Sequence, residues 1–362
     1  MFQKYGLNKI DFGGTPPTVV VGMSGGVDSS VAALLLKWQG FNVIGLFMKN
    51  WEETTPGGFC PSEADFSDVK RVAETIGIPY YSVNFSKLYM ESVFNVFLDG
   101  LKCGTTPNPD VLCNREVKFG PFLKKAFEIG ADFVATGHYC RVSDGKLFKG
   151  IDQHKDQSYF LCGLSGEQLS HVLFPVGGLE KTQVREIARN AGIVTAEKKD
   201  STGICFIGER KFKEFLKSYV GGKAGEIRTL DGKLVGRHEG LMYYTLGQRK
   251  GMGIGGIGEN TQRWFVVKKD LKENILYVSN GECPEMYTKE VFAWNFNWIS
   301  EIRGGKLTAK LRYRQPDQKC TVEVLSDCRV RAMFDKPQRA VTPGQWLVLY
   351  DGDVCLGGGV IQ

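Results

Sequence analysis

The chain has 362 residues, of which 42% are hydrophobic and 24% are charged, as in an ordinary globular protein of two or three domains. Its net charge of +6 permits a polyanionic partner but does not require one. Residues 1–17 lack the pattern of a secretory signal, and no apolar segment approaches the roughly 18 residues that span a bilayer. We therefore expect a cytoplasmic protein without a membrane segment.

The first half of the chain alternates strand-like and helix-like segments. Apolar runs predict strands at residues 19–21, 42–48, 80–85 and 133–136. Helical periodicity and capping signals predict helices at residues 31–38, 62–76, after 86, 116–129, 166–173 and 182–191. This alternation predicts a parallel, doubly wound sheet, in which ligands bind beyond the carboxyl ends of the strands. The turn after Val21 is thus the expected cofactor site.

The second half changes character after a last predicted helix at residues 209–220. Short β-type runs follow, separated by turn signals such as Asn280-Gly281 and Asp351-Gly352. The last ~80 residues predict a small antiparallel barrel or sandwich. The expected division is an extension at 1–17, an α/β domain with the expected cofactor site at 18–209, a central domain at 210–281 and a β-barrel domain at 282–362.

A glycine- and serine-rich loop follows the first predicted strand and opens a helix. Adjacent glycines let the backbone approach a polyanion, and free N–H groups at the helix start supply donors. Asp28 would repel a phosphate unless a divalent cation bridges them, so Mg²⁺ is expected with the nucleotide. A tight strand-to-helix turn is the plainer alternative. The expected nucleotide-binding residues here are Gly22, Met23, Ser24, Gly25, Gly26, Val27, Asp28 and Ser29.

This loop contains no lysine and so is not a standard P-loop. Its Ser-Gly-Gly-x-Asp-Ser sequence resembles the loop of the PP-loop ATP pyrophosphatases, which cleave ATP to AMP and pyrophosphate. The resemblance implies that the substrate is activated as an adenylate. A second glycine cluster at residues 251–256 matches a dinucleotide-binding pattern, but it lacks the flanking strand and helix. We interpret that cluster as a loop.

Two of the ten cysteines lie in distinctive segments. Cys113 ends a proline-stiffened stretch that is expected to enter a helix at about Glu116, where the helix dipole would favour the thiolate. Asp110 is placed to act as an acid or base. Cys205 follows two lysines and a glycine, which favour a reactive thiolate. Either cysteine could instead fill the core, but beside an adenylating loop the pair suggests sulfur transfer.

Seven separated motifs occupy residues 47–51, 108–114, 135–139, 155–161, 200–206, 244–251 and 340–345. Together they resemble the tRNA-specific 2-thiouridylase family, over nearly the whole chain. The leader and residues 54–62, with Cys60, depart from the family pattern. The resemblance implies an adenine nucleotide alpha hydrolase-like sheet followed by a small central domain and an antiparallel β-barrel.

The resemblance also implies a reaction. ATP with Mg²⁺ would bind along the loop, with Met48 and Gly137 near the adenosine. The C2 oxygen of the wobble uridine in tRNAs for Lys, Glu and Gln would be adenylated. Cys205 would carry a persulfide supplied by a sulfur-relay protein, and a Cys113–Cys205 disulfide would form as AMP departs. The order of the two cysteine steps stays open, with Asp110 as the acid or base.

The tRNA contacts implied by the resemblance come from several segments. Some lie near the flipped-out base or the anticodon: Asn108, Pro109, Asp110, His138, Lys155, Asp156 and Gln157. His138 could instead be an internally bonded histidine at a strand end. Others lie in the C-terminal domain: Arg312, Tyr313 and Gln345. Arg312 and Arg314 are expected to share one strand face with Tyr313 between them, where they could neutralise phosphates while the ring stacks on a base. A solvated basic strand is the alternative.

Two other classes of function were compared with this one. An adenylating synthetase for a small molecule would need an ammonia source or an amino-acid pocket, and no glutaminase cysteine begins the chain. A non-catalytic RNA-binding protein would not need an intact loop together with both loop cysteines. We expect the enzyme to act as a monomer.

Overall fold

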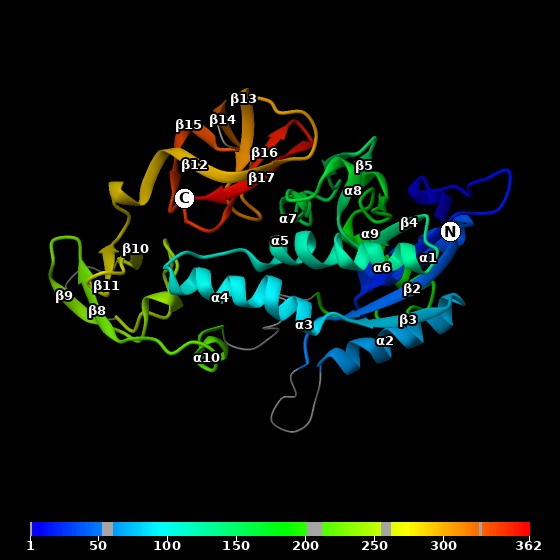
Figure 1. The fold of residues 1–362 in the computed structure, drawn as a ribbon, viewed down its shortest axis with the longest axis horizontal. Coiled ribbons are helices and arrows are strands. Elements are labelled where there is room, and N and C mark those ends of the chain that lie inside the picture. Colours follow the sequence, from blue (N-terminus) through cyan, green and yellow to red (C-terminus); the bar gives the residue numbers. More distant parts are fainter. Residues whose placement is uncertain (1, 53–60, 201–211, 255–261, 326–327) are drawn as a thin grey trace.

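A five-stranded parallel sheet forms the centre of the N-terminal region (Figure 1). The computed structural model describes residues 2–52, 61–200, 212–254, 262–325 and 328–362. The sheet order is β3 (Tyr80–Asn84), β2 (Asn42–Lys49), β1 (Thr18–Met23), β4 (Phe133–Thr136) and β7 (Val172–Leu173). All four pairings are parallel, which confirms the predicted doubly wound sheet. The strand order reverses between β1 and β4, so the switch point lies where the glycine-rich loop begins.

Helices cover both faces of this sheet because its central strand is apolar on both sides. Val19 and Val21 pack with α1 (Val27–Gln39), α2 (Pro61–Ile76) and α9 (Lys181–Asn190). Val20, which points to the opposite face, packs with α6 (Pro121–Glu128). Successive side chains of a strand point to opposite faces, so this valine run is buried on both faces of the sheet.

Several predicted helices differ in their bounds. The helix after Ser86 is confirmed as a continuous run of α3 (Ser86–Tyr89), a π-helical stretch (Met90–Phe94) and α4 (Asn95–Lys102). The helix predicted at 116–129 is broken into a π-helical turn (Asn114–Lys118) and α6. Pro121 causes the break, because proline disfavours helical backbone at the residue before it. A short helix before the break, α5 (Pro109–Cys113), was not predicted.

The helix predicted at 166–173 is likewise shorter. It forms α8 (Gly166–Ser170), which is capped by Ser165 and Gln168, and its expected end is the edge strand β7. The short helix α7 (Ser158–Leu161) precedes it. The helix predicted at 209–220 is α10 (Phe212–Lys217), with residues 209–211 outside the described part of the chain.

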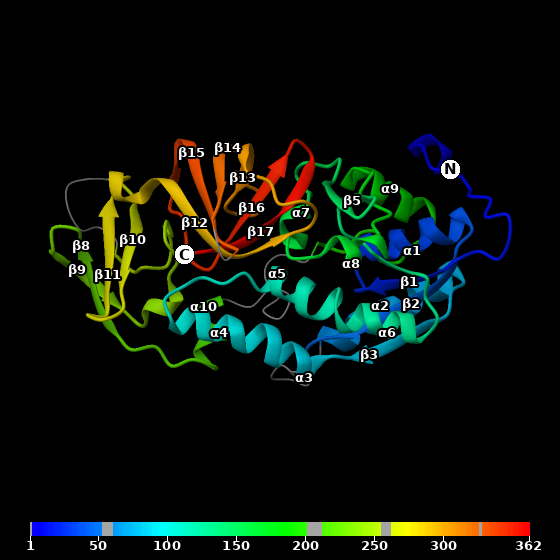
Figure 2. The ribbon, with the colours of Figure 1, turned by 45° about the horizontal axis from the view of Figure 1, so that its top comes forward.

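The central region is a second, smaller sheet at the opposite end of the molecule from the N-terminal sheet (Figures 1 and 2). Its order is β10 (Trp264–Asp270), β11 (Ile275–Asn280), β8 (Gly225–Thr229) and β9 (Leu234–His238). Its buried residues share one hydrophobic cluster with α4 and α10. The long helical run of α3 and α4 therefore joins the two ends of the molecule.

The C-terminal region is a closed antiparallel barrel, as predicted. Its strands are β12 (Tyr287–Trp298), β15 (Val330–Arg339), β14 (Gln318–Val324), β13 (Gly305–Lys310), β16 (Trp346–Asp351) and β17 (Val354–Ile361), and β12 also pairs with β17. One addition was not predicted: the hairpin of β5 (Cys140–Ser143) and β6 (Lys146–Lys149) pairs with β17. Asp144 and Gly145, both with positive φ, form its turn, so a recognisable hairpin signal was present. This hairpin attaches the barrel to the N-terminal region.

Candidate active site

The glycine-rich loop connects β1 to α1 at the switch point of the sheet. The Ser24 amide donates to Ser29 Oγ (3.2 Å), and Ser30 Oγ donates to the Gly26 carbonyl (2.8 Å). Gly26 caps α1 without any side-chain hydrogen bond. The N–H groups at the start of this 13-residue helix are therefore available to an anion.

Two glycines are required by the packing around the loop. Gly25 has a φ of +73°, and a Cβ there would lie 2.6 Å from the Asp65 carbonyl oxygen. A Cβ on Gly137 would lie 2.5 Å from the Ser29 amide nitrogen. The carboxyl end of β4 thus lies directly against the loop. Gly137, expected near the adenosine, is placed at the predicted nucleotide site.

Asp28 is held by two side chains that were not identified in the sequence. Lys181 Nζ, at the start of α9, lies 2.7 and 2.8 Å from its two carboxylate oxygens. The Tyr139 hydroxyl donates to the same carboxylate at 2.7 Å. Burial first, and then Asp28, raise the pKa of Tyr139, which keeps that hydroxyl a donor. Lys181 balances the charge of Asp28, so Asp28 does not by itself require Mg²⁺ beside a phosphate.

Lys181 also brings a cation to a loop whose own sequence has none. Its side chain is nearly buried, and it lies 153 residues from Asp28 in the chain. A second lysine, Lys198, donates to the Gly25 carbonyl at 3.0 Å and pairs with Asp65 and Asp68. No local motif marks either lysine, since only the packing of distant segments brings them to the loop.

Asp200 extends this charge network toward the second cysteine segment. It pairs with Lys155 (2.6 Å), Lys181 (2.7 Å) and Arg185 (2.8 Å). Burial would raise the pKa of Asp200, but hydrogen bonds from Lys155 and Lys181 outweigh it and lower the value to about 2. Asp200 is thus a fixed anion. Cys205, five residues later, lies outside the described residues, as does Cys60.

Cys113 lies at the end of a short helix and not before one. Asn108 caps α5, its Oδ1 accepting from the amides of Asp110 (3.1 Å) and Val111 (3.3 Å), and Pro109 is the first helical residue. The expectation that a helix N-terminus lowers the Cys113 pKa is therefore wrong. Burial raises the pKa of this thiol, which is only 1% exposed, while Lys118 acts in the opposite direction.

The surroundings of Cys113 connect it to α10. Cys113 belongs to the same hydrophobic cluster as Phe215 and Leu216 of α10, the helix that follows the Cys205 segment. Trp51, just beyond β2, contacts Phe215 with ring centroids 6.2 Å apart. Met48, near the end of β2, packs against this cluster and also against the cluster under β1. Met48 therefore contacts both the cluster that contains Val20 of β1 and the cluster that contains Cys113.

Three consecutive residues with expected tRNA roles bond within the chain. Lys155 pairs with Asp200, as described above. Asp156 is buried and accepts from Lys310 of the barrel at 3.2 Å. The Gln157 side-chain oxygen accepts from the Tyr139 amide at 2.9 Å. This segment thus ties together the barrel, the nucleotide loop and Asp200.

His138 is similarly engaged. Its Nδ1 lies 2.7 Å from Thr136 Oγ1, and its ring is 6.0 Å from that of Phe119. Burial, with a smaller effect from Lys118, lowers the pKa of His138 well below its ordinary value. The imidazole is therefore neutral at pH 7.

The prediction that Arg312 and Arg314 share one face of a strand is wrong. β13 ends at Lys310, and residues 312–314 form a turn in which Arg314 has a φ of +66°. Pro316 follows closely, and proline cannot donate to a strand ladder. The Tyr313 ring packs on Phe160, with centroids 4.3 Å apart.

Arg312 and Gln345, for which RNA contacts were also expected, donate hydrogen bonds to backbone carbonyls of this chain. Arg312 donates to the Ala340 carbonyl and to Thr342 Oγ1 (3.3 Å). Gln345 donates to the Thr106 carbonyl at 2.7 Å. The barrel loop that carries Gln345 therefore lies on the segment that leads into α5.

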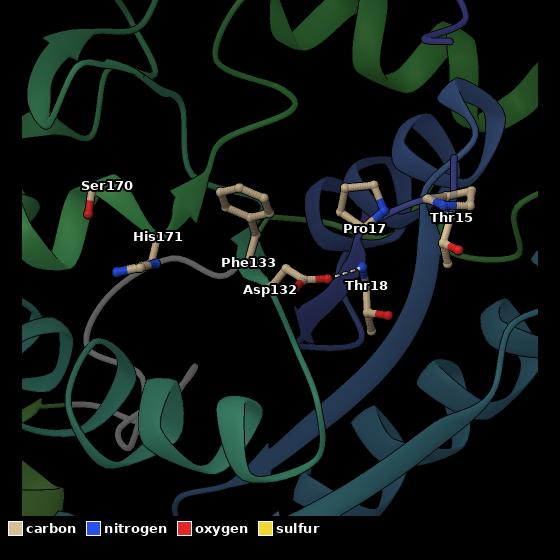
Figure 3. Close-up of a pocket in the computed structure, with 8 residues that line it drawn as sticks. Thr15, Pro17, Thr18, Asp132, Phe133, Ser170 and His171 are labelled. Carbon is tan, nitrogen blue, oxygen red and sulfur yellow. Dashed lines mark hydrogen bonds between the residues drawn. The ribbon is translucent and has the colours of Figure 1, made fainter. Parts of the chain in front are cut away.

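A separate hollow lies at the amino ends of β1 and β4 (Figure 3). Asp132 there accepts from the Thr18 amide at 2.7 Å. The hollow lies at the edge of the sheet opposite the loop, so it is not part of the nucleotide site. Its lining includes Thr15, Pro17, Thr18, Asp132, Phe133, Ser170 and His171.

Within the described ranges, no group of three or more His, Cys, Asp or Glu side chains is arranged to hold a metal ion. No helix there is long and apolar enough to cross a membrane.

Family models match three successive parts of the chain. They describe a tRNA methyl transferase HUP domain (residues 17–209), a tRNA methyl transferase PRC-barrel domain (213–280) and an aminomethyltransferase beta-barrel domain (288–361). A tRNA-specific 2-thiouridylase MnmA from Alkaliphilus oremlandii is 58% identical over 352 residues, covering 95% of this chain and 96% of that protein. The protein of that name from Bacillus subtilis is 57% identical over 353 residues, covering 95% and 94%.

Among solved structures, the U34-tRNA thiolase NcsA from Methanococcus maripaludis aligns over 56% of this chain and 65% of that chain. Its identity of 16% and TM-score of 0.37 are too low to support an inference. The extent and identity of the sequence matches are decisive instead: this chain belongs to the tRNA-specific 2-thiouridylase family.

Proposed function

We propose that this chain is an ATP-dependent tRNA 2-thiouridylase, which replaces the C2 oxygen of the wobble uridine in tRNAs for Lys, Glu and Gln with sulfur. The observation that carries the proposal is that Met48 packs against two hydrophobic clusters at once. One contains Val20 of β1, the strand that leads into the glycine-rich loop, and the other contains Cys113. We propose that a nucleotide at the loop has its α-phosphate within reach of a base held at α5.

The loop and the start of α1 would bind the phosphates of ATP, with Met48 and Gly137 beside the adenosine. Lys181 supplies a positive charge at the loop, which the loop sequence lacks. Mg²⁺ would enter on the phosphates of ATP, as is usual for this ion. Attack of the uracil C2 oxygen on the α-phosphorus breaks the bond to pyrophosphate. The oxygen, a poor leaving group on its own, can then depart as part of AMP.

Sulfur insertion would use Cys205 and Cys113. A sulfur-relay protein would load Cys205 as a persulfide. Either the terminal sulfur attacks C2 and Cys113 then cleaves the resulting disulfide, or Cys113 first attacks the persulfide and releases hydrosulfide to C2. Both routes give the same products: 2-thiouridine, AMP and a Cys113–Cys205 disulfide, which must be reduced before the next turnover. Asp110 would take or return the proton of the base.

The segment between Cys205 and α10 is long enough to let Cys205 reach Cys113. Phe212 begins α10, whose residues Phe215 and Leu216 share the cluster of Cys113. Cys205 lies seven residues before Phe212. An extended chain spans about 3.4 Å per residue, so Cys205 lies within about 24 Å of Phe212 along the chain. That reach is ample for contact with the Cys113 helix.

For the tRNA, we propose two kinds of contact. Asn108, Pro109 and Asp110 would surround the flipped-out base, because an enzyme reaches an atom within a folded nucleic acid by extruding the nucleotide. His138 and Tyr313 would touch the anticodon region. Five further residues bond within the chain and would support the protein surface that contacts the tRNA. They are Lys155, Asp156, Gln157, Arg312 and Gln345.

The test uses unmodified tRNA-Lys transcript with ATP, Mg²⁺ and a persulfide donor, followed by mass spectrometry of the nucleosides. We expect 2-thiouridine at the wobble position and one AMP released for each. Folded protein that binds ATP and yields no 2-thiouridine would refute the proposal. Cys205→Ser should abolish thiolation while ATP-dependent adenylation of the tRNA persists. Loss of adenylation as well would assign Cys205 a structural role instead.

A further inference from the structure

Asn114, the residue after Cys113, has a buried acceptor to which no described residue donates. The residue is 2% exposed, and its Nδ2 donates to the Phe160 carbonyl at 3.1 Å. Its Oδ1 is buried and accepts no hydrogen bond from the described part of the chain. The Phe160 carbonyl fixes this orientation, since turning the amide over would place two acceptors face to face. Buried polar atoms are nearly always paired, so this oxygen is a candidate for a ligand's donor.

The orphan oxygen belongs to the same face of the helix as the reacting groups. Asn114 keeps helical backbone at the end of α5, with φ −63° and ψ −46°. Asp110 lies four residues earlier, and residues four apart on a helix share a face. Cys113 lies three residues after Asp110, so Cys113 and Asn114 flank Asp110 on its two sides. A base that contacts Asp110 is therefore close to Asn114.

A second contact links Asn114 to the barrel. Phe160, whose carbonyl holds the Asn114 amide, packs its ring on Tyr313. Arg314 lies 5.5 Å from the Tyr313 ring centroid. An arginine and an aromatic ring thus gather on the barrel side of Asn114, and such groups suit a nucleotide. Asn114 lies at the junction between the reacting helix and this turn.

We propose that Asn114 determines the identity of the base by accepting the N3–H of uracil through its Oδ1. The inference rests on the proposed function and deepens it. Uracil carries a proton on N3, directly beside the reacting C2, whereas N3 of cytosine carries a lone pair. Cytosine also has a C2 oxygen, so a contact at N3 would distinguish the two bases where the C2 oxygen alone could not. An acceptor facing the cytosine lone pair is unfavourable and leaves Asn114 unpaired.

The contact acts before sulfur arrives. N3 loses its proton when O2 is adenylated, so Asn114 recognises the base on binding, and the proton then leaves to a base such as Asp110. Cys113 and Asn114 are both covered in the structure, at 1% and 2% exposure. Uracil therefore reaches them in the tRNA-bound arrangement of the segments around α5.

The experiment compares two tRNA-Lys transcripts that differ only in uridine or cytidine at position 34. Binding is measured with α,β-methylene-ATP, which occupies the nucleotide site without allowing adenylation. We expect the unaltered protein to bind the uridine transcript about 10-fold or more tightly than the cytidine transcript, which is the effect of losing one buried hydrogen bond. Asn114→Leu, of similar volume, should reduce that ratio to near one.

Asn297→Leu is the matched control. Its amide also donates to backbone carbonyls, those of Cys162 (2.9 Å) and Leu164 (2.8 Å), but it lies on β12 of the barrel. This variant should keep the full preference for uridine. A preference that survives in Asn114→Leu would overturn the inference, as would equal binding of both transcripts by the unaltered protein, which needs no variant to fold. Failure to thiolate the uridine transcript at all would instead refute the proposed function.

Discussion

Replacing Lys181 with methionine tests the charge arrangement at the nucleotide loop. Lys181 pairs with Asp28 and Asp200 at 2.7 Å each, and its side chain is 11% exposed. Methionine keeps most of the apolar stem and removes the charge. Asp28 would then keep only the hydroxyl of Tyr139 as a described partner, beside the phosphates of ATP. We expect weaker ATP binding and lower stability.

The magnitude follows from the burial of the three groups. Removing one partner of a fully buried ion pair costs about 3–5 kcal/mol. Asp28 and Asp200 are 30% and 29% exposed at their side chains, so water compensates part of the loss. Asp200 also keeps Lys155 and Arg185. We therefore expect a loss of about 1–3 kcal/mol in the free energy of unfolding.

Calorimetric titration with ATP and chemical unfolding measure the two effects. ATP affinity should fall about 10-fold or more, since 1.4 kcal/mol corresponds to a factor of ten. The double variant with Asp28→Asn should cost less than the sum of the single variants, because the two residues interact directly. Lys125→Met, which breaks the exposed pair with Glu128, is the control and should change neither quantity. Unaltered ATP affinity and stability in Lys181→Met would refute the reasoning.

Three further predictions concern the same region. Gly137→Ala should weaken ATP binding about 10-fold in calorimetry, because its Cβ would lie 2.5 Å from the Ser29 amide and must displace the loop; unchanged binding would contradict that packing. The pKa of Asp200 is lowered from 3.8 to about 2, so its contribution to stability is present above pH 4 and is lost as the pH falls toward 2. Unfolding measured between pH 5 and 2 should show this loss, and Asp200→Asn should reduce it. Without tRNA, iodoacetamide should modify the exposed Cys103 much faster than the buried Cys113, whose pKa is raised by burial, as peptide mass spectrometry can follow; equal rates would show that Cys113 is accessible.

The fold class could be predicted because its signals are local. The valine run of β1 is apolar at every position, as a strand buried on both faces must be, and the helical spacing of α1 and α9 shows in short windows. Asn280-Gly281 and similar pairs mark turns in the second half of the chain for the same reason. The secondary-structure predictions were wrong where a local pattern is compatible with two structures. Residues 166–173 carry apolar residues that suit either a helix or a helix followed by an edge strand, and the pairing with β4 decided between them.

The sequence alone determined the reaction class, because the loop between β1 and α1 is a contiguous motif whose glycines and serines act through nearby backbone. It also pointed to Cys113 and Asp110, which lie three residues apart. Only the tertiary structure showed that Lys181 and Tyr139 hold Asp28, that Asp156 bonds to Lys310 of the barrel, and that Asn114 has a buried oxygen to which no described residue donates. These pairs are separated by 111 to 154 residues, and the state of the Asn114 oxygen depends on burial that no window of sequence contains. Charge balance and desolvation are properties of the packed molecule, so the charge partners and burial of the site residues could be read only from the tertiary structure.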